Sequence, residues 1–177
     1  MPRLPEVLDR ASLPEEKREI FDYLVKTRGG VRIPFSVVLN NPEVTYRVAH
    51  VGTYVRFESS LPDRTRELAV LTAAHERDVA FEWAAHVRGA REVGISEAAV
   101  EAIANDRGLE ALDDEEALPV RFARELLRDK RLSDATFDAA RVRLGDAGVI
   151  DLTATVGYYA MLGCLLNALE IEPPVSA

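Results

Sequence analysis

The sequence predicts an all-α fold, and three observations support this prediction. Apolar residues recur at helical spacing over most of the chain, as in Val44, Val48 and Val51. No stretch alternates apolar and polar residues with the period of two that a half-buried strand requires. Prolines, glycine pairs and capping residues stand where successive helices would begin and end. The 177 residues, 47% of them hydrophobic, are therefore expected to form a single domain over residues 1–177 with a substantial core.

The first elements follow from prolines and glycines. Residues 1–13, which include Pro2 and Pro5, should form an extended arm. Ser12 as N-cap, with Pro14 in the first turn, predicts a helix to about residue 27 that Gly29 ends. Further helical segments are expected at residues 35–39, 42–57, 62–94 as a hairpin broken at 75–78, 97–105, 113–129, 133–144 and 152–169.

Four residues are predicted to cap the later helices. Ser96 and Ser133 each precede a helical pattern, and Asp78 and Asp151 should cap the second arm of the hairpin and the last helix. The acidic run at residues 113–116 suits a helix N-terminus, where negative charge complements the helix dipole.

Composition excludes several function classes. A net charge of −8 argues against a nucleic-acid partner, because phosphate binding needs a basic face. No apolar run reaches the roughly 20 residues that cross a bilayer, and the start of the chain lacks the apolar core of a signal peptide. We therefore expect a cytoplasmic protein without a membrane partner. The single cysteine, Cys164, suits a reducing compartment and is expected to be buried and inert.

The segment at residues 64–94 holds two of the three histidines and the only tryptophan. Glu82 and His86 have i, i+4 spacing, which places their side chains roughly 6 Å apart on one helix. A carboxylate raises the pKa of a neighbouring imidazole, whereas burial lowers it. Glu67 would lie about 28 Å from His86 along an unbroken helix, so it joins the pair only if the chain folds back at residues 75–78. The alternative is an ordinary surface pair with a solvated Glu67.

The remaining candidates are weaker. His75-Glu76 begins like a zinc-protease HExxH motif, but Val79 stands where the second histidine belongs, so no metal is expected. No glycine-rich phosphate loop is present, which implies no nucleotide cofactor. Four residues are candidates for lining a substrate pocket: Trp83, His50, Tyr159 and Asn167. Packing in the core or at an interface is the more usual role of residues such as Trp83 and His50, and capping or core hydrogen bonds explain Tyr159 and Asn167 equally well.

The segments RELAVL, FEWAAHVRGAREVGIS and GYYAMLGCLLNALEI together resemble the carboxymuconolactone decarboxylase family, whose superfamily includes the AhpD-type alkylhydroperoxidases. The peroxidase branch carries a Glu, eleven residues, a Cys, two residues, a second Cys, three residues and a His. On this spacing the Glu is Glu67 and the His is His86, while Val79 and Glu82 occupy the cysteine positions. The chain therefore looks like the cysteine-free Glu-Trp-x-x-His branch.

This resemblance implies an AhpD-like helical bundle that assembles as a homo-oligomer, commonly a trimer or hexamer. It implies a cofactor-free lyase of aromatic catabolism that acts on a small carboxylated lactone. His86 would be the acid/base, Glu82 would set its pKa and orientation, and Glu67 would shuttle a proton. The alternatives are a peroxide-reducing antioxidant protein, which the missing cysteine pair disfavours, and a non-catalytic oligomeric binding protein.

Overall fold

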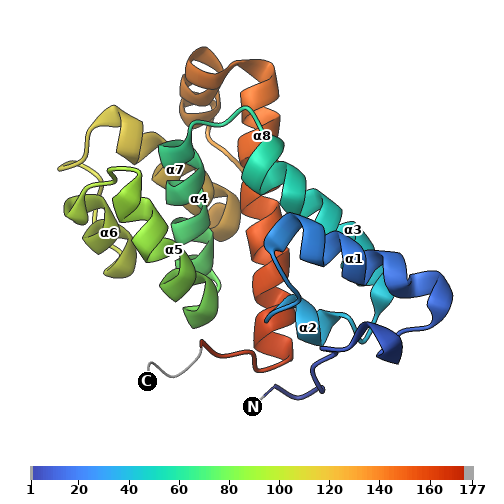
Figure 1. The fold of residues 1–177 in the computed structure, drawn as a ribbon. Helices are drawn as coiled ribbons and strands as arrows, with labels where there is room; N and C mark the ends of the chain where they lie inside the picture. The colour runs from blue at the N-terminus through green and yellow to red at the C-terminus, as the bar shows by residue number, and fades with distance from the viewer. Residues whose placement is uncertain (1, 174–177) are drawn as a thin grey trace. The chain divides into compact units, whose positions relative to one another are not determined.

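The computed structural model describes residues 2–173, which contain eight α-helices and no β-strand (Figure 1). The prediction of an all-α fold is confirmed. The chain divides into two compact units, which are described separately below. The first comprises the described residues up to Glu58 together with Leu165–Glu172, and the second comprises Ser59–Cys164 with Pro173. The single domain inferred from length stays a prediction.

The first unit contains three α-helices joined by short turns. In chain order its elements are the 3-10 helices η1 (Arg10–Ser12) and η2 (Glu15–Lys17), α1 (Arg18–Arg28), α2 (Phe35–Val38), α3 (Pro42–Thr53) and the π-helical turn η3 (Tyr54–Glu58). Helix α1 packs against α3, and α2 also contacts α3. As predicted, Gly29 ends α1, in the left-handed conformation (φ 72°) that glycine adopts without strain.

The start of α1 was predicted wrongly. Ser12 is the last residue of η1, which Asp9 caps by accepting a hydrogen bond from the Ala11 N–H at 2.9 Å. Leu13 is extended (φ −90°, ψ 144°), because a residue before proline avoids the helical region. The α-helix therefore starts only at Arg18, after η2.

The second unit is built around α4 (Asp63–Glu76). Helix α4 forms a hairpin with α5 (Ala80–Glu92), drawn in green in Figure 1, and also packs against α6 (Glu97–Ala104) and α7 (Asp114–Arg124). Every residue from Leu68 to Ala74 is buried. Leu68 and Leu71 face a core shared with α5, α6 and α7, whereas Ala69 faces a second core shared with α7 and α8 (Asp134–Ala168). Helix α4 is therefore buried on several sides, which fixes the orientation of its polar residues.

Three of the predicted helix starts hold in the second unit. The Ser96 side chain accepts from the Ala99 N–H at 3.1 Å, and the Ser133 hydroxyl accepts from the Thr136 N–H at 3.2 Å. The acidic run begins α7, where Asp113 accepts from the Glu116 N–H, and α7 continues into the π-helical turn η4 (Glu125–Asp129).

Two predicted caps are wrong. The hairpin breaks where expected, but Asp78 takes a left-handed conformation (φ 51°) and Val79 occupies the N-cap position of α5. An N-cap needs extended backbone, so Asp78 cannot serve there. In α8 the break lies at Gly145, and Asp151 lies inside the helix, buried. Its carboxylate instead accepts from the Ser60 N–H and hydroxyl, at 2.9 and 2.8 Å.

Helix α8 is long and apolar enough to meet the length and composition criteria for a membrane span. Buried core helices meet the same criteria, and 56% of its most apolar 18-residue window is buried within the structure. These criteria are therefore weak grounds for a membrane location, and the cytoplasmic location stays a prediction.

Candidate functional site

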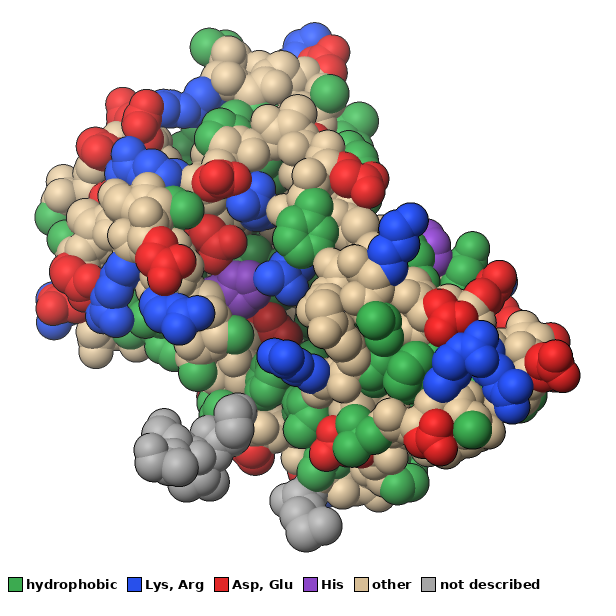
Figure 2. All heavy atoms as spheres, in the orientation of Figure 1, with side chains coloured by type: hydrophobic (Ala, Val, Ile, Leu, Met, Phe, Trp, Pro, Cys, Tyr) green, Lys and Arg blue, Asp and Glu red, His purple; other side chains and the backbone are tan. Residues whose placement is uncertain are grey.

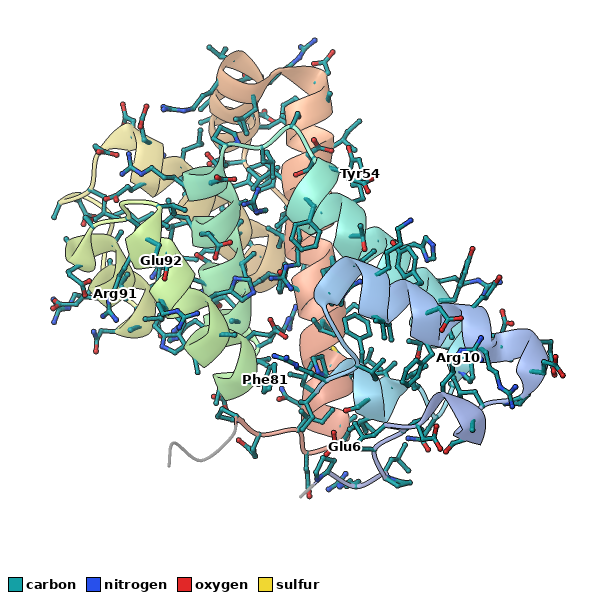
Figure 3. The ribbon with its side chains drawn as sticks, viewed as in Figure 1. Glu6, Arg10, Tyr54, Phe81, Arg91 and Glu92 are labelled. Carbon is teal, nitrogen blue, oxygen red and sulfur yellow. The ribbon has the colours of Figure 1, made fainter. Side chains whose placement is uncertain are left out.

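The hairpin of α4 and α5 positions the three predicted catalytic residues. Glu67 lies on α4, and Glu82 and His86 lie one turn apart on α5. In Figure 3, helix α5 runs from the labelled Phe81 at its start to the labelled Arg91 and Glu92 at its end. Gly89 of α5 leaves room for the Glu67 carboxylate: a Cβ atom added there would lie 3.6 Å from Glu67 Oε2. The methyl group of an alanine would fit at position 89, whereas a side chain larger than that of alanine would push the carboxylate aside.

His86 stands between the two carboxylates. Its Nδ1 atom lies 2.8 Å from Glu67 Oε2, and its Nε2 atom lies 3.4 Å from Glu82 Oε2. The side chains of His86, Glu67 and Glu82 are only 10%, 13% and 7% exposed. The chain thus folds back as predicted and brings Glu67 to the pair. The alternative of a surface pair with a solvated Glu67 is wrong.

The pKa of His86 is raised above its ordinary value of 6.5. Burial is the largest single influence and acts to lower the pKa, because it removes water from the charged ring. The neighbouring carboxylates of Glu67 and Glu82 together outweigh burial and raise it. The two carboxylates therefore shift the ring toward the imidazolium form, which can donate one N–H toward each of them.

An aromatic residue of α8, Tyr159, packs against His86. Its ring meets the His86 ring edge-on, with centroids 5.2 Å apart, and Tyr158 packs edge-on against Tyr159 at the same distance. Both tyrosines are buried. Tyr159, one of the four predicted pocket residues, therefore lies against His86.

The other predicted pocket residues have different surroundings. Trp83 is half-buried, packs on the core shared by α4 to α7, and lies beside His75, with ring centroids 6.1 Å apart. His75 and Trp83 line a cavity of about 260 Å³. His50 belongs to the first unit, where it stacks on Tyr23 with centroids 3.9 Å apart. Asn167 also belongs to the first unit.

Within residues 2–173 one group of side chains has metal-ligand spacing. The ligand atoms of His75, Glu76 and Asp106 all lie within 4.8 Å of one another. The Arg128 guanidinium, however, donates to both Glu76 and Asp106 and offsets part of their negative charge. The group is therefore an ion-pair network between Arg128 and the two carboxylates. A metal ion would have to displace Arg128 to bind there.

Sequence reasoning missed two neighbours of the site and misplaced Cys164. Arg66 Nε lies 3.9 Å from Glu67 Oε1, on the side of the carboxylate away from His86, and Gly89 provides the space described above. Neither residue belongs to a catalytic pattern. Cys164 was expected to be buried but is exposed, because it faces outward on α8 while its neighbour Leu162 faces the core.

Charged side chains on the face shown in Figure 2 are of mixed sign. Lys and Arg side chains alternate with Asp and Glu side chains across it. Ion pairs such as Arg91 with Glu97 and Arg143 with Glu115 join side chains of opposite sign on the molecular surface. The absence of a nucleic-acid partner, which was inferred from the net charge, stays a prediction.

Comparisons with known proteins support a common family and fold. Residues 42–125, which include Glu67, Glu82 and His86, match the sequence model of the carboxymuconolactone decarboxylase family. A comparison with curated protein sequences gives no match.

Three solved structures share the fold along most of their length. An uncharacterised peroxidase-related protein of Ralstonia eutropha JMP134, described as an alkylhydroperoxidase AhpD core, is 18% identical with a TM-score of 0.76 over 97% of this chain and 92% of that one. A second peroxidase-related protein, from Silicibacter sp. TM1040, is 20% identical with a TM-score of 0.75 over 98% and 94%. A putative antioxidant defence protein AhpD of Agrobacterium tumefaciens is 21% identical with a TM-score of 0.68 over 82% and 99%. At these identities the likeness establishes an AhpD-like fold.

Proposed function

We propose that this chain, of which residues 42–125 match the carboxymuconolactone decarboxylase family model and whose fold is AhpD-like, is a cofactor-free enzyme. In this proposal His86 is a general acid/base that acts on a small carboxylated, lactone-type substrate. The observation that carries this proposal is the buried arrangement of His86 between Glu67 and Glu82. Titratable groups with perturbed pKa values in such surroundings are typical of catalytic sites.

The proposed chemistry needs one well-placed proton. In a decarboxylation the bond between the carboxylate carbon and the ring carbon breaks, and its electron pair stays on the ring carbon, where the unsaturated lactone delocalises it. Carbon dioxide leaves, and the proton of the His86 imidazolium forms the new C–H bond. Neutral His86 then regains a proton from solvent by way of a neighbouring carboxylate. No oxidant or reductant is required.

The two contacts of His86 suggest different roles for the carboxylates. The 2.8 Å contact with Glu67 is an ordinary hydrogen-bond length, so Glu67 is suited to hold the ring and return its proton. The 3.4 Å contact with Glu82 is longer than an ordinary hydrogen bond and is the one that a substrate atom can replace. In this proposal Nε2 faces the substrate and Glu82 orients the ring when the site is empty.

Peroxide reduction is the alternative that the names of the similar structures raise. That chemistry needs a thiolate nucleophile and a second thiol to resolve it. Val79 and Glu82 occupy the corresponding positions here, and the single cysteine, Cys164, lies on α8 rather than on the hairpin. A peroxidase would have to use Cys164 alone or together with another copy of the chain.

The experiment follows 4-carboxymuconolactone turnover spectroscopically for the wild type, His86→Ala, Cys164→Ser and His75→Ala, beside a peroxide-consumption assay. His75→Ala is the matched control, since it removes a histidine from the same hairpin outside the cluster. We expect the wild type, Cys164→Ser and His75→Ala to decarboxylate, and His86→Ala to lose at least about 100-fold in rate.

Two results would contradict the proposal. Full turnover by His86→Ala would exclude His86 as the acid/base. Peroxide consumption that disappears in Cys164→Ser, with no lactone turnover, would favour the redox alternative. If both assays are silent while the protein still binds small acids in a thermal-shift screen, the non-catalytic binding protein is favoured instead.

A further inference from the structure

The His86 cluster is the end of a longer chain of alternating charges. Asp63 Oδ1 lies 2.7 Å from Arg66 Nη2, and Arg66 Nε lies 3.9 Å from Glu67 Oε1. The other oxygen of Glu67 contacts His86, whose far nitrogen faces Glu82. Anions and cations therefore follow one another through five residues, and Glu67 is shared between Arg66 and His86.

We propose that Arg66 is a positioning residue of the His86 site, which offsets part of the negative charge that Glu67 presents to the imidazole. Its side chain is only 16% exposed, so solvent screens its charge weakly compared with the arginines on the surface. The inference rests on the proposed function for its catalytic meaning, but the charge balance itself can be measured without turnover.

Contacts with His86 come from three helices. Glu67 reaches it from α4, Glu82 from α5 and Tyr159 from α8. Arg66 is the cation next to this set, and it also binds the exposed carboxylate of Asp63. Because like charges disfavour each other, a cation beside the Glu67–His86 pair must make the imidazolium release its proton more readily.

This offset has a use in acid/base catalysis. Two carboxylates that held the imidazolium without opposition would make it a poor proton donor, because a general acid works best with a pKa near the working pH. Arg66 limits that effect while it leaves Glu67 in hydrogen-bond contact with the ring. In this arrangement Glu67 orients the His86 ring, and Arg66 adjusts the acidity of its imidazolium form.

The test is an NMR titration of the His86 ring in the full-length protein, with the His86 signals assigned by their loss in His86→Gln. Arg66→Met removes the charge and keeps the length of the side chain, and Arg66→Lys keeps the charge. We expect Arg66→Met to raise the pKa of His86 by at least about 0.5 unit and Arg66→Lys to stay within about 0.3 unit of the wild type.

Arg88→Met is the matched control. Arg88 lies on α5 two residues after His86, but its side chain is 88% exposed and pairs with Glu92, so its loss should not shift the titration. An unchanged or lowered His86 pKa in Arg66→Met would overturn the inference. If Arg66→Met does not fold, Arg66→Gln, which retains hydrogen-bond donors, is the second neutral variant and must show the same rise.

The two proposals fail separately. A raised pKa in the neutral Arg66 variants, together with silent turnover assays, would overturn the proposed function and leave the role of Arg66 standing. Turnover that depends on His86, together with a His86 pKa that does not change in the Arg66 variants, would support the proposed function and overturn the role of Arg66.

Discussion

At the scale of single residues, the two carboxylates beside His86 are not equivalent. Glu67 makes the shorter contact, 2.8 Å against 3.4 Å, and the cluster is buried from water. Glu67→Gln keeps the shape of the side chain and removes its charge. We expect it to lower the pKa of His86, because a cause of the raised value is lost, and to lower turnover by about 10–100-fold. The pH dependence of the rate and the NMR titration measure both effects.

Glu82→Gln and Glu92→Gln complete this comparison. Glu82→Gln should have the smaller effect on the His86 pKa, because its contact is longer. Glu92 is exposed on the same helix and pairs with Arg88, so Glu92→Gln should change nothing. Equal titration curves for Glu67→Gln and the wild type would mean that the charge of Glu67 does not raise the pKa of His86.

The site residues differ in how far the sequence predicts them. The i, i+4 spacing places Glu82 beside His86 on any helix, so that contact is local and predictable. Glu67 required the reversal at residues 75–78, which polar composition indicated. Arg66 and Gly89 matter only through how α4 faces α5. That orientation depends on the packing of Leu68 and Leu71, which one-dimensional spacing does not encode.

At the scale of elements, the break inside α8 depends on one glycine. Gly145 has φ 71° and ψ 176°, a conformation that is essentially open only to glycine. Gly145→Ala should therefore destabilise the protein by about 1–3 kcal/mol, because the strain has to be absorbed or the break has to move. Chemical denaturation measures the loss.

Gly89→Ala is the matched control for this prediction. Gly89 lies within α5, and an added Cβ meets Glu67 Oε2 at 3.6 Å, an ordinary contact. The same substitution should here be neutral or stabilise by up to about 1 kcal/mol, since alanine is the better helix former. If both glycines respond alike, the conformation of Gly145 does not govern its cost.

The mistaken helix starts also belong to this scale. Asp78 and Asp151 are residue types that favour N-caps, and both precede apolar helical patterns. Asp151 is instead recruited by Ser60, ninety-one positions earlier in the chain. The predicted helix end at residue 144 is correct, since Gly145 interrupts α8, but the helix resumes at once and not at the predicted cap Asp151. Long-range hydrogen bonds therefore override local capping preference at this position, and no local pattern reveals them.

At the scale of the whole molecule, the raised pKa of His86 couples folding to pH. A group with a higher pKa in the folded state than in the unfolded state binds its proton more tightly when folded. Its stabilising contribution is complete below the unfolded value of about 6.5 and is lost as the pH rises through the folded value. The second unit, which contains the site, should therefore lose this contribution in alkaline solution.

The comparison of wild type with His86→Gln isolates this contribution. Urea unfolding followed by the fluorescence of Trp83, the only tryptophan, reports on the second unit. We expect the difference in unfolding free energy between wild type and His86→Gln to be larger at pH 6 than at pH 9, because the imidazolium predominates in both states at pH 6, whereas its stabilising contribution is lost as the pH rises through the folded pKa. Arg88→Gln, an exposed change on the same helix, should parallel the wild type at both values. A difference that is constant or grows toward pH 9 would mean that the pKa of His86 is not raised in the folded protein, and the two carboxylates would then not stabilise the imidazolium that the acid role requires.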